Sequence, residues 1–76
     1  MITILVFGRL SDITKSDKLL WPFTGDTNSL RQTLETKYPE LSAVAYSLAV
    51  NKKLAVYNEV LNDGAEVALL PPFSGG

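Results

Sequence analysis

The 76-residue sequence contains no cysteine and no histidine. Without cysteine the chain can form no disulfide and offers no thiolate to a metal, and a small domain built without such links suits a reducing cytoplasm. Without cysteine or histidine the common nucleophile–base pairs cannot be assembled. The acidic residues show no spacing typical of a cation-binding loop. We therefore expect a chain that binds no cofactor or metal itself and is not an enzyme alone.

Excess charge and long apolar runs are also missing. The net charge is −1 and the Lys and Arg residues are scattered, which gives no electrostatic basis for binding nucleic acid. No apolar run approaches the roughly 18 residues of a membrane span, and Met1 leads directly into a strand pattern rather than a signal peptide. A hydrophobic content of 46% argues against disorder. We expect one cytoplasmic domain with no membrane association.

The most informative stretch lies at the end of the chain. An apolar strand pattern ends at Leu70, and the last six residues, Pro71-Pro72-Phe73-Ser74-Gly75-Gly76, follow it. The two prolines cannot continue a strand, because proline has no N–H donor and a fixed φ. From Phe73 onward the side chains become smaller, and the last two residues have none. Gly75 and Gly76 can therefore enter a slot that a Cβ would block.

This pattern predicts a domain over residues 1–70 and an extended C-terminal tail over residues 71–76. If the chain takes part in chemistry, the free carboxylate of Gly76 is the best candidate for the reactive group, because the side chains supply no better one. An ordinary frayed terminus with turn-like composition is the alternative.

Upstream of the tail, the patterns predict several strands and one long helix. β-Branched and aromatic residues favour the strands, an Asp-Gly pair favours a turn before the last strand, and Pro22 restricts the second strand to a sheet edge. The sequence does not decide whether residues 54–57 form a strand. The expected elements are strands at 2–7, 18–23, 46–51 and 66–70, a helical turn at 10–14, a turn at 24–26, a helix at 30–38 and a connector at 40–45 in which Leu41 and Val44 pack.

The long helix has a recognisable start and one apolar face. Thr27, Asn28 and Ser29 are candidate N-caps, and Ser29 with Gln32 fits a capping box, in which each side chain bonds a free backbone N–H of the first turn. Leu30, Leu34 and Tyr38 recur four residues apart and should share the buried face, and the proline after Tyr38 should end the helix.

One helix can cover only one face of a sheet, so the sequence predicts an α+β fold with a mixed sheet and one main helix across one face. An opening hairpin, a helical crossover and a closing strand beside the first are the order of the β-grasp, or ubiquitin-like, fold. Its first and last strands lie side by side and parallel. The face away from the helix would then expose more apolar surface than a soluble monomer usually shows, contributed by Leu5, Phe7, Ala68 and Leu70.

The end of the chain resembles a known family. Residues 62–76, Asn-Asp-Gly-Ala-Glu-Val-Ala-Leu-Leu-Pro-Pro-Phe-Ser-Gly-Gly, are similar to the ending of the small, sulfur-carrying subunit of molybdopterin synthase. There a D-G-x-E-V strand precedes two prolines, an apolar residue, a small residue and Gly-Gly. The pair Phe7-Gly8 and the stretch Ala49-Val50-Asn51 also look like that family, and the resemblance covers essentially the whole chain. The loop at 9–17 departs from it, being less charged than the family's segment.

The resemblance implies a sulfur-carrier function. In similar proteins an E1-like adenylyltransferase uses ATP to activate the terminal carboxylate, and a sulfur-donating enzyme supplies the sulfur that displaces AMP. The product here would be a thiocarboxylate on Gly76, which donates sulfur to a cyclic pyranopterin monophosphate in the large synthase subunit to build the molybdopterin dithiolene. By the same resemblance, this chain and the large synthase subunit would form a heterotetramer. The residues expected at the interface with the large subunit are Phe7, Leu54, Leu70, Pro72 and Phe73.

Three other functions remain open on the sequence. The first is sulfur transfer for thiamine, for tRNA thiolation or for a tungsten cofactor, although the thiamine-pathway carrier usually lacks Pro71-Pro72. The second is a ubiquitin-like modifier conjugated to lysines through Gly76, although such modifiers usually carry a basic stretch before Gly-Gly. The third is a plain binding module in which Gly76 has no chemical role.

Overall fold

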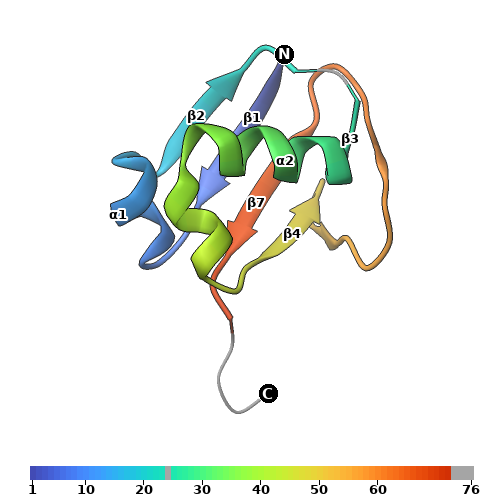
Figure 1. Ribbon diagram of the computed structural model, residues 1–76. Helices are drawn as coiled ribbons and strands as arrows, with labels where there is room; N and C mark the ends of the chain where they lie inside the picture. The colour runs from blue at the N-terminus through green and yellow to red at the C-terminus, as the bar shows by residue number, and fades with distance from the viewer. Residues whose placement is uncertain (24, 73–76) are drawn as a thin grey trace.

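The computed structural model describes residues 1–23 and 25–72. A five-stranded sheet carries one long helix across one face, and a short pair of strands lies at its side (Figure 1). In chain order the elements are β1 (Ile2–Val6), α1 (Leu10–Thr14), β2 (Lys18–Trp21), β3 (Gly25–Asp26), α2 (Thr27–Lys37), the 3-10 helix η1 (Pro39–Ala43), β4 (Ser47–Val50), β5 (Lys53–Leu54), β6 (Val60–Leu61) and β7 (Glu66–Leu70). None of the helices in these ranges is long and apolar enough to cross a membrane.

The sheet has the strand order β2-β1-β7-β4-β5. β1 and β7 run parallel in its centre, with Thr3 opposite Glu66 and Val6 opposite Leu69. β2 pairs antiparallel with β1 at the edge, as the proline after β2 indicates, and β4 pairs antiparallel with β7. The mixed sheet, its central parallel pair and the single main helix confirm the predicted β-grasp fold.

The core lies between the sheet and α2. β1 and β7 alternate between buried and half-buried side chains, because successive residues of a strand point to opposite faces. The buried side chains of both strands meet Leu30 and Leu34 of α2, which are fully buried. The largest fully buried side chains are Ile2, Ile4, Leu30, Leu34, Leu41, Leu48, Val67 and Leu69.

The start of α2 corrects the sequence prediction. The helix begins at Thr27, and the side chain of Asp26 caps it by accepting a hydrogen bond of 2.8 Å from the N–H of Ser29. Ser29 is thus inside the first turn, and the predicted capping box of Ser29 and Gln32 is wrong. The hydrogen bonds from Ser29, followed by one from Asn58, lower the pKa of Asp26. The helix ends before Pro39, as predicted.

Two further expectations fail at element ends. β2 stops at Trp21, so Phe23 is not part of the strand. Leu41 is fully buried, as expected, but Val44 has an exposed fraction of 41% and does not pack into the core. Leu41 lies inside the five-residue 3-10 helix η1 and Val44 follows its last residue, a difference that a connector pattern does not reveal.

The segment from β5 to β6 answers the question that the sequence leaves open. Leu54 belongs to the two-residue strand β5, whereas residues 55–57 are irregular. The turn expected at 24–26 is wrong for Gly25 and Asp26, which form β3 and pair with β6, while Thr24 lies outside the described residues. The side chain of Asn58 helps to hold this pair against α2, accepting a 2.9 Å bond from the N–H of Asn28.

Candidate functional site

The candidate site begins where β7 leaves the sheet. β7 is a central strand, and Pro71 and Pro72 follow its last residue at the same edge at which β1 ends (Figure 1). The structure describes these first two residues of the predicted tail. Phe73, Gly75 and Gly76, which the sequence analysis names as interface and reactive residues, lie outside the described residues. The described part of the site is therefore the root of the tail and the sheet surface beside it.

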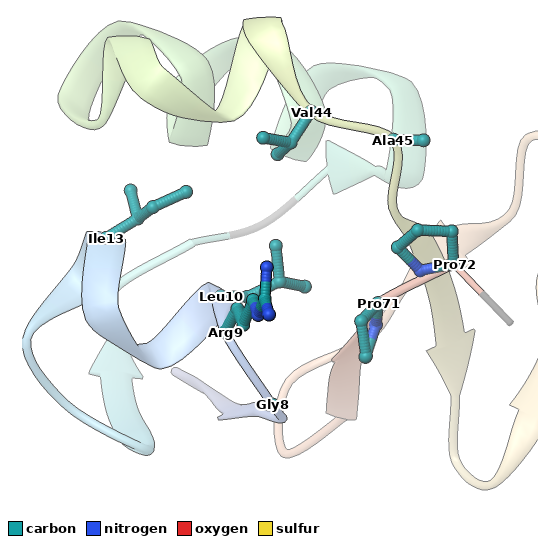
Figure 2. A pocket seen from close by; sticks show the side chains of 8 residues that line it. All are labelled: Gly8, Arg9, Leu10, Ile13, Val44, Ala45, Pro71 and Pro72. Atoms are coloured by element: carbon teal, nitrogen blue, oxygen red, sulfur yellow. The ribbon is translucent and has the colours of Figure 1, made fainter. Parts of the chain in front are cut away.

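A pocket of about 690 Å³ opens at the root of the tail, between α1, the end of η1 and the two prolines (Figure 2). It is a mainly apolar hollow, in which Pro71 and Pro72 face Leu10 of α1. Arg9 is the one charged side chain among the described residues that line it. The lining residues are Gly8, Arg9, Leu10, Ile13, Val44, Ala45, Pro71 and Pro72. The exposed Val44, which the sequence analysis placed in the core, thus contributes to this pocket.

Among the described residues, large apolar side chains remain exposed on the sheet face opposite α2. The register places Leu5, Ala68, Ala49 and Leu54 in one row across β1, β7, β4 and β5. Leu5 and Ala68 are half-buried, whereas Leu54 has an exposed fraction of 57%. An apolar row therefore extends from the first strand to the far edge of the sheet.

A second apolar pair lies closer to the tail. Phe7 has an exposed fraction of 45%, and its N–H donates a 3.1 Å hydrogen bond to the carbonyl of Leu69. The parallel register of β1 and β7 then places Phe7 beside the half-buried Leu70. Phe7, Leu54 and Leu70 thus lie on one face, which we call the open sheet face. It comprises Leu5, Phe7, Leu20, Ala49, Leu54, Ala68 and Leu70.

Sequence reasoning missed two members of this face. Leu20 lies opposite Thr3 and has an exposed fraction of 66%. Leu19 and Leu20 are adjacent in β2 and point to opposite faces of the sheet. Because both are leucine, the sequence does not reveal which of them points outward. Ala49 lies on the same face between Ala68 and Leu54, and it is buried there.

The start of β4, next to Leu70, is held by a polar contact. The hydroxyl of Tyr46 donates a 2.5 Å hydrogen bond to a carboxylate oxygen of Glu35, and the guanidinium of Arg31 lies 5.1 Å from the centre of the Tyr46 ring. Burial, followed by the hydrogen bond and charge of Glu35, raises the pKa of Tyr46 to about 12. This contact ties β4 to α2, and the raised pKa keeps the Tyr46 hydroxyl protonated at neutral pH.

The described residues offer little else for catalysis. Residues 1–23 and 25–72 contain no group of three or more His, Cys, Asp or Glu side chains placed to hold a metal ion. What the described site provides is a central strand that ends in two prolines, an apolar pocket beside them and the open sheet face. Such an arrangement can present a main-chain terminus to another protein.

Comparison with known proteins places the chain in a family. The ThiS family model matches residues 4–76. A curated relative, the molybdopterin synthase sulfur carrier subunit of Mycobacterium tuberculosis, is 32% identical over 80 aligned positions that include 99% of this chain and 96% of the relative.

Solved structures show the same fold. The small archaeal modifier protein 1 of Methanosarcina acetivorans superposes with a TM-score of 0.82 at 20% identity, over 99% of this chain and 95% of that one. A candidate molybdopterin converting factor, subunit 1, of Pyrococcus furiosus gives a TM-score of 0.81 at 18% identity, over 95% of this chain and 97% of that one. At these low sequence identities, the similarity between the structures shows a shared fold and nothing further. Together with the match over nearly the whole sequence, it leads to one conclusion: the chain belongs to the ThiS family and has its ubiquitin-like β-grasp fold.

Proposed function

We propose that this protein is a sulfur carrier and the sulfur-donating small subunit of a molybdopterin synthase. The observation that carries the proposal is the 32% identity, over nearly the full length of both chains, to a molybdopterin synthase sulfur carrier subunit. The family match extends through Gly76, so it includes the Gly-Gly end on which the chemistry would take place. The tail root at the centre of the sheet supports the proposal, because a central strand anchors the base of the tail firmly.

The proposed chemistry uses the main-chain carboxylate of Gly76. An E1-like adenylyltransferase joins this carboxylate to the AMP part of ATP and releases pyrophosphate. A sulfide equivalent from a sulfur-donating enzyme then attacks the carbonyl carbon and displaces AMP, which leaves a thiocarboxylate. In the large synthase subunit this sulfur replaces an oxygen on a carbon of a cyclic pyranopterin monophosphate, which returns Gly76 to its carboxylate form, and two such transfers complete the dithiolene. Acid–base groups belong to the partner in this scheme, because this chain has no histidine or cysteine.

The proposed partner surface is the open sheet face. Phe7 and Leu54 are large apolar side chains that remain exposed on it, and Leu70 links it to the tail. Docking of this face against the large subunit would remove apolar area from water while the tail enters the active site, a form of C-terminal capture. Pro72 lines the pocket at the tail root, and Pro72 with Phe73 would guide the tail.

Mass spectrometry of the intact protein tests the proposed chemistry. The protein is incubated with the adenylyltransferase of the same source, ATP and a sulfide donor. We expect the mass increase of one sulfur replacing one oxygen, confined to the C-terminal peptide and dependent on ATP. The fold alone does not separate a carrier from a protein modifier, since both have it. Heavier species joined to lysines, without the thiocarboxylate, would favour the modifier and contradict the proposal.

Phe7→Glu is expected to weaken binding to the large subunit by about thirtyfold or more, because it places a charge within the proposed apolar contact, beside the root of the tail. The free energy of unfolding of the single chain should change by less than about 1 kcal/mol, since Phe7 is already 45% exposed. Titration calorimetry and thermal denaturation measure the two effects.

Val60→Glu is the matched control for this substitution. Val60 is also apolar and exposed, but it belongs to β6 in the small second sheet. We expect Val60→Glu to bind the large subunit as the unmodified protein does. Equal losses of binding and stability in Phe7→Glu would instead assign Phe7 to the core.

A further inference from the structure

We propose that Gly8 is a positioning residue: its backbone packs against the ring of Pro71 and thereby sets the direction in which the C-terminal tail leaves the sheet. The inference rests on the proposed function, because the direction of the tail matters only if Gly76 must reach other active sites. It concerns a residue that lies outside the tail and outside the open sheet face.

Two features of Gly8 disfavour a side chain at this position. Its φ is +59°, in the left-handed region that residues with a Cβ rarely adopt. A Cβ built on Gly8 would also lie 3.1 Å from Cγ of Pro71, with Cβ and Cδ of the same ring at 3.7 and 3.8 Å. The proline ring therefore packs closely against Gly8, and a methyl group there would require the ring to shift by a few tenths of an ångström.

Gly8 is held in place by contacts with both α1 and the sheet. The carbonyl of Gly8 accepts a 3.2 Å hydrogen bond from the N–H of Ser11 and a 2.9 Å bond from its hydroxyl. Leu10, in the same turn, is buried in the core. On the other side, the bond from Phe7 to Leu69 ties the preceding residue to β7. Because Gly8 is fixed to both α1 and the sheet, a steric conflict would be relieved by movement of Pro71.

A small displacement at Pro71 matters because the tail is long relative to its base. Five residues follow Pro71, and an extended chain of that length spans at most about 17 Å. A tilt at Pro71 changes the direction in which Pro72 and the residues after it leave the sheet. Since a misplacement of about an ångström can already slow a reaction strongly, a misdirected tail should react slowly even in a folded protein.

Gly64→Ala is a matched control for Gly8→Ala. Gly64 also has a positive φ, +86°, but a Cβ there would meet nothing within 4 Å. Both variants should lower Tm by a few degrees, because both place a Cβ in the left-handed region. Only Gly8→Ala should slow sulfur transfer from a preformed thiocarboxylate, by about tenfold or more. Equal transfer rates in the two variants would overturn the proposal.

A double-variant cycle tests whether Gly8 acts through Pro71. Pro71→Ala removes the Cγ atom that a Cβ on Gly8 would approach. We expect Gly8→Ala to lower Tm and the transfer rate less in a Pro71→Ala background than in the unmodified chain. If Gly8→Ala alone does not fold, Pro71→Ala should restore folding. Purely additive effects, or no restoration, would contradict the coupling.

A spin label gives a readout that does not depend on sulfur chemistry. The chain has no cysteine, so Ser74→Cys provides a single thiol for a nitroxide. We expect the amide resonances broadened by the nitroxide to differ between Gly8→Ala and the unmodified chain, and to be unchanged in Gly64→Ala. An unchanged pattern in Gly8→Ala would refute the positioning role. If the unmodified protein forms no thiocarboxylate, the proposed function fails, and this measurement still decides the role of Gly8.

Discussion

Deletion of Gly76 is expected to abolish sulfur transfer completely while leaving the domain folded. Under the proposed chemistry the new terminus ends one residue short of both partner active sites, so neither adenylation nor transfer can take place. The buried core identified among the described residues ends at Leu69, so this deletion removes none of it. We expect the free energy of unfolding to change by less than about 0.5 kcal/mol. Intact-mass analysis after incubation with the adenylyltransferase, together with thermal denaturation, measures both quantities.

Extension by one residue past Gly76 is the complementary variant. It keeps every residue of the chain but converts the carboxylate of Gly76 into a peptide bond. With no protease present to trim it, the extended protein should form no thiocarboxylate. Normal sulfur donation by the extended protein, or a large fall in Tm on deletion of Gly76, would show that the reactive group or the extent of the domain has been assigned wrongly.

Leu34→Ala is expected to lower the free energy of unfolding by about 2–5 kcal/mol. The Leu34 side chain has an exposed fraction of 0% and packs between α2 and the sheet. Its truncation removes apolar contacts and leaves a cavity that the surrounding strands cannot fill completely. For a domain of this size, each kcal/mol lowers Tm by roughly 4–8 °C, so the loss should be large in a thermal melt.

Gln32→Ala is the control on the same helix. Gln32 is exposed, and alanine is a slightly better helix former, so stability should stay within about 0.5 kcal/mol. Denaturant titration of both variants gives the comparison. A cost below about 0.5 kcal/mol for Leu34→Ala would mean that the apolar face of α2 does not face the sheet.

The alternation of residues along a strand predicted burial correctly where the two faces of the strand differ clearly in their exposure to the core. Ile2, Ile4 and Val6 are buried, as is Val67 opposite Ile4, and Phe7 is exposed. The reason is local: successive side chains of a strand point to opposite faces, so a run of β-branched residues already separates core from surface. The β-grasp topology followed from the same runs, because a single helix can cover only one face.

Short elements held by distant contacts could not be predicted in this way. β3 and β6 contain two residues each, and they exist because Gly25 pairs with Leu61, far along the chain. The start of α2 depends on the same region, since Asp26 of β3 is also the helix cap. A two-residue strand leaves no periodic pattern, so sequence reasoning took this segment for a turn.

The amino-acid sequence alone determined the fold class, the main helix, the central strands and the two prolines that end β7, because each depends on local stereochemistry or on the period of apolar residues. Only the tertiary structure decided that Leu20 and Ala49 extend the open sheet face and that Pro71 rests on Gly8. These facts depend on strand register and on close approach between residues more than 60 positions apart, which no local pattern encodes.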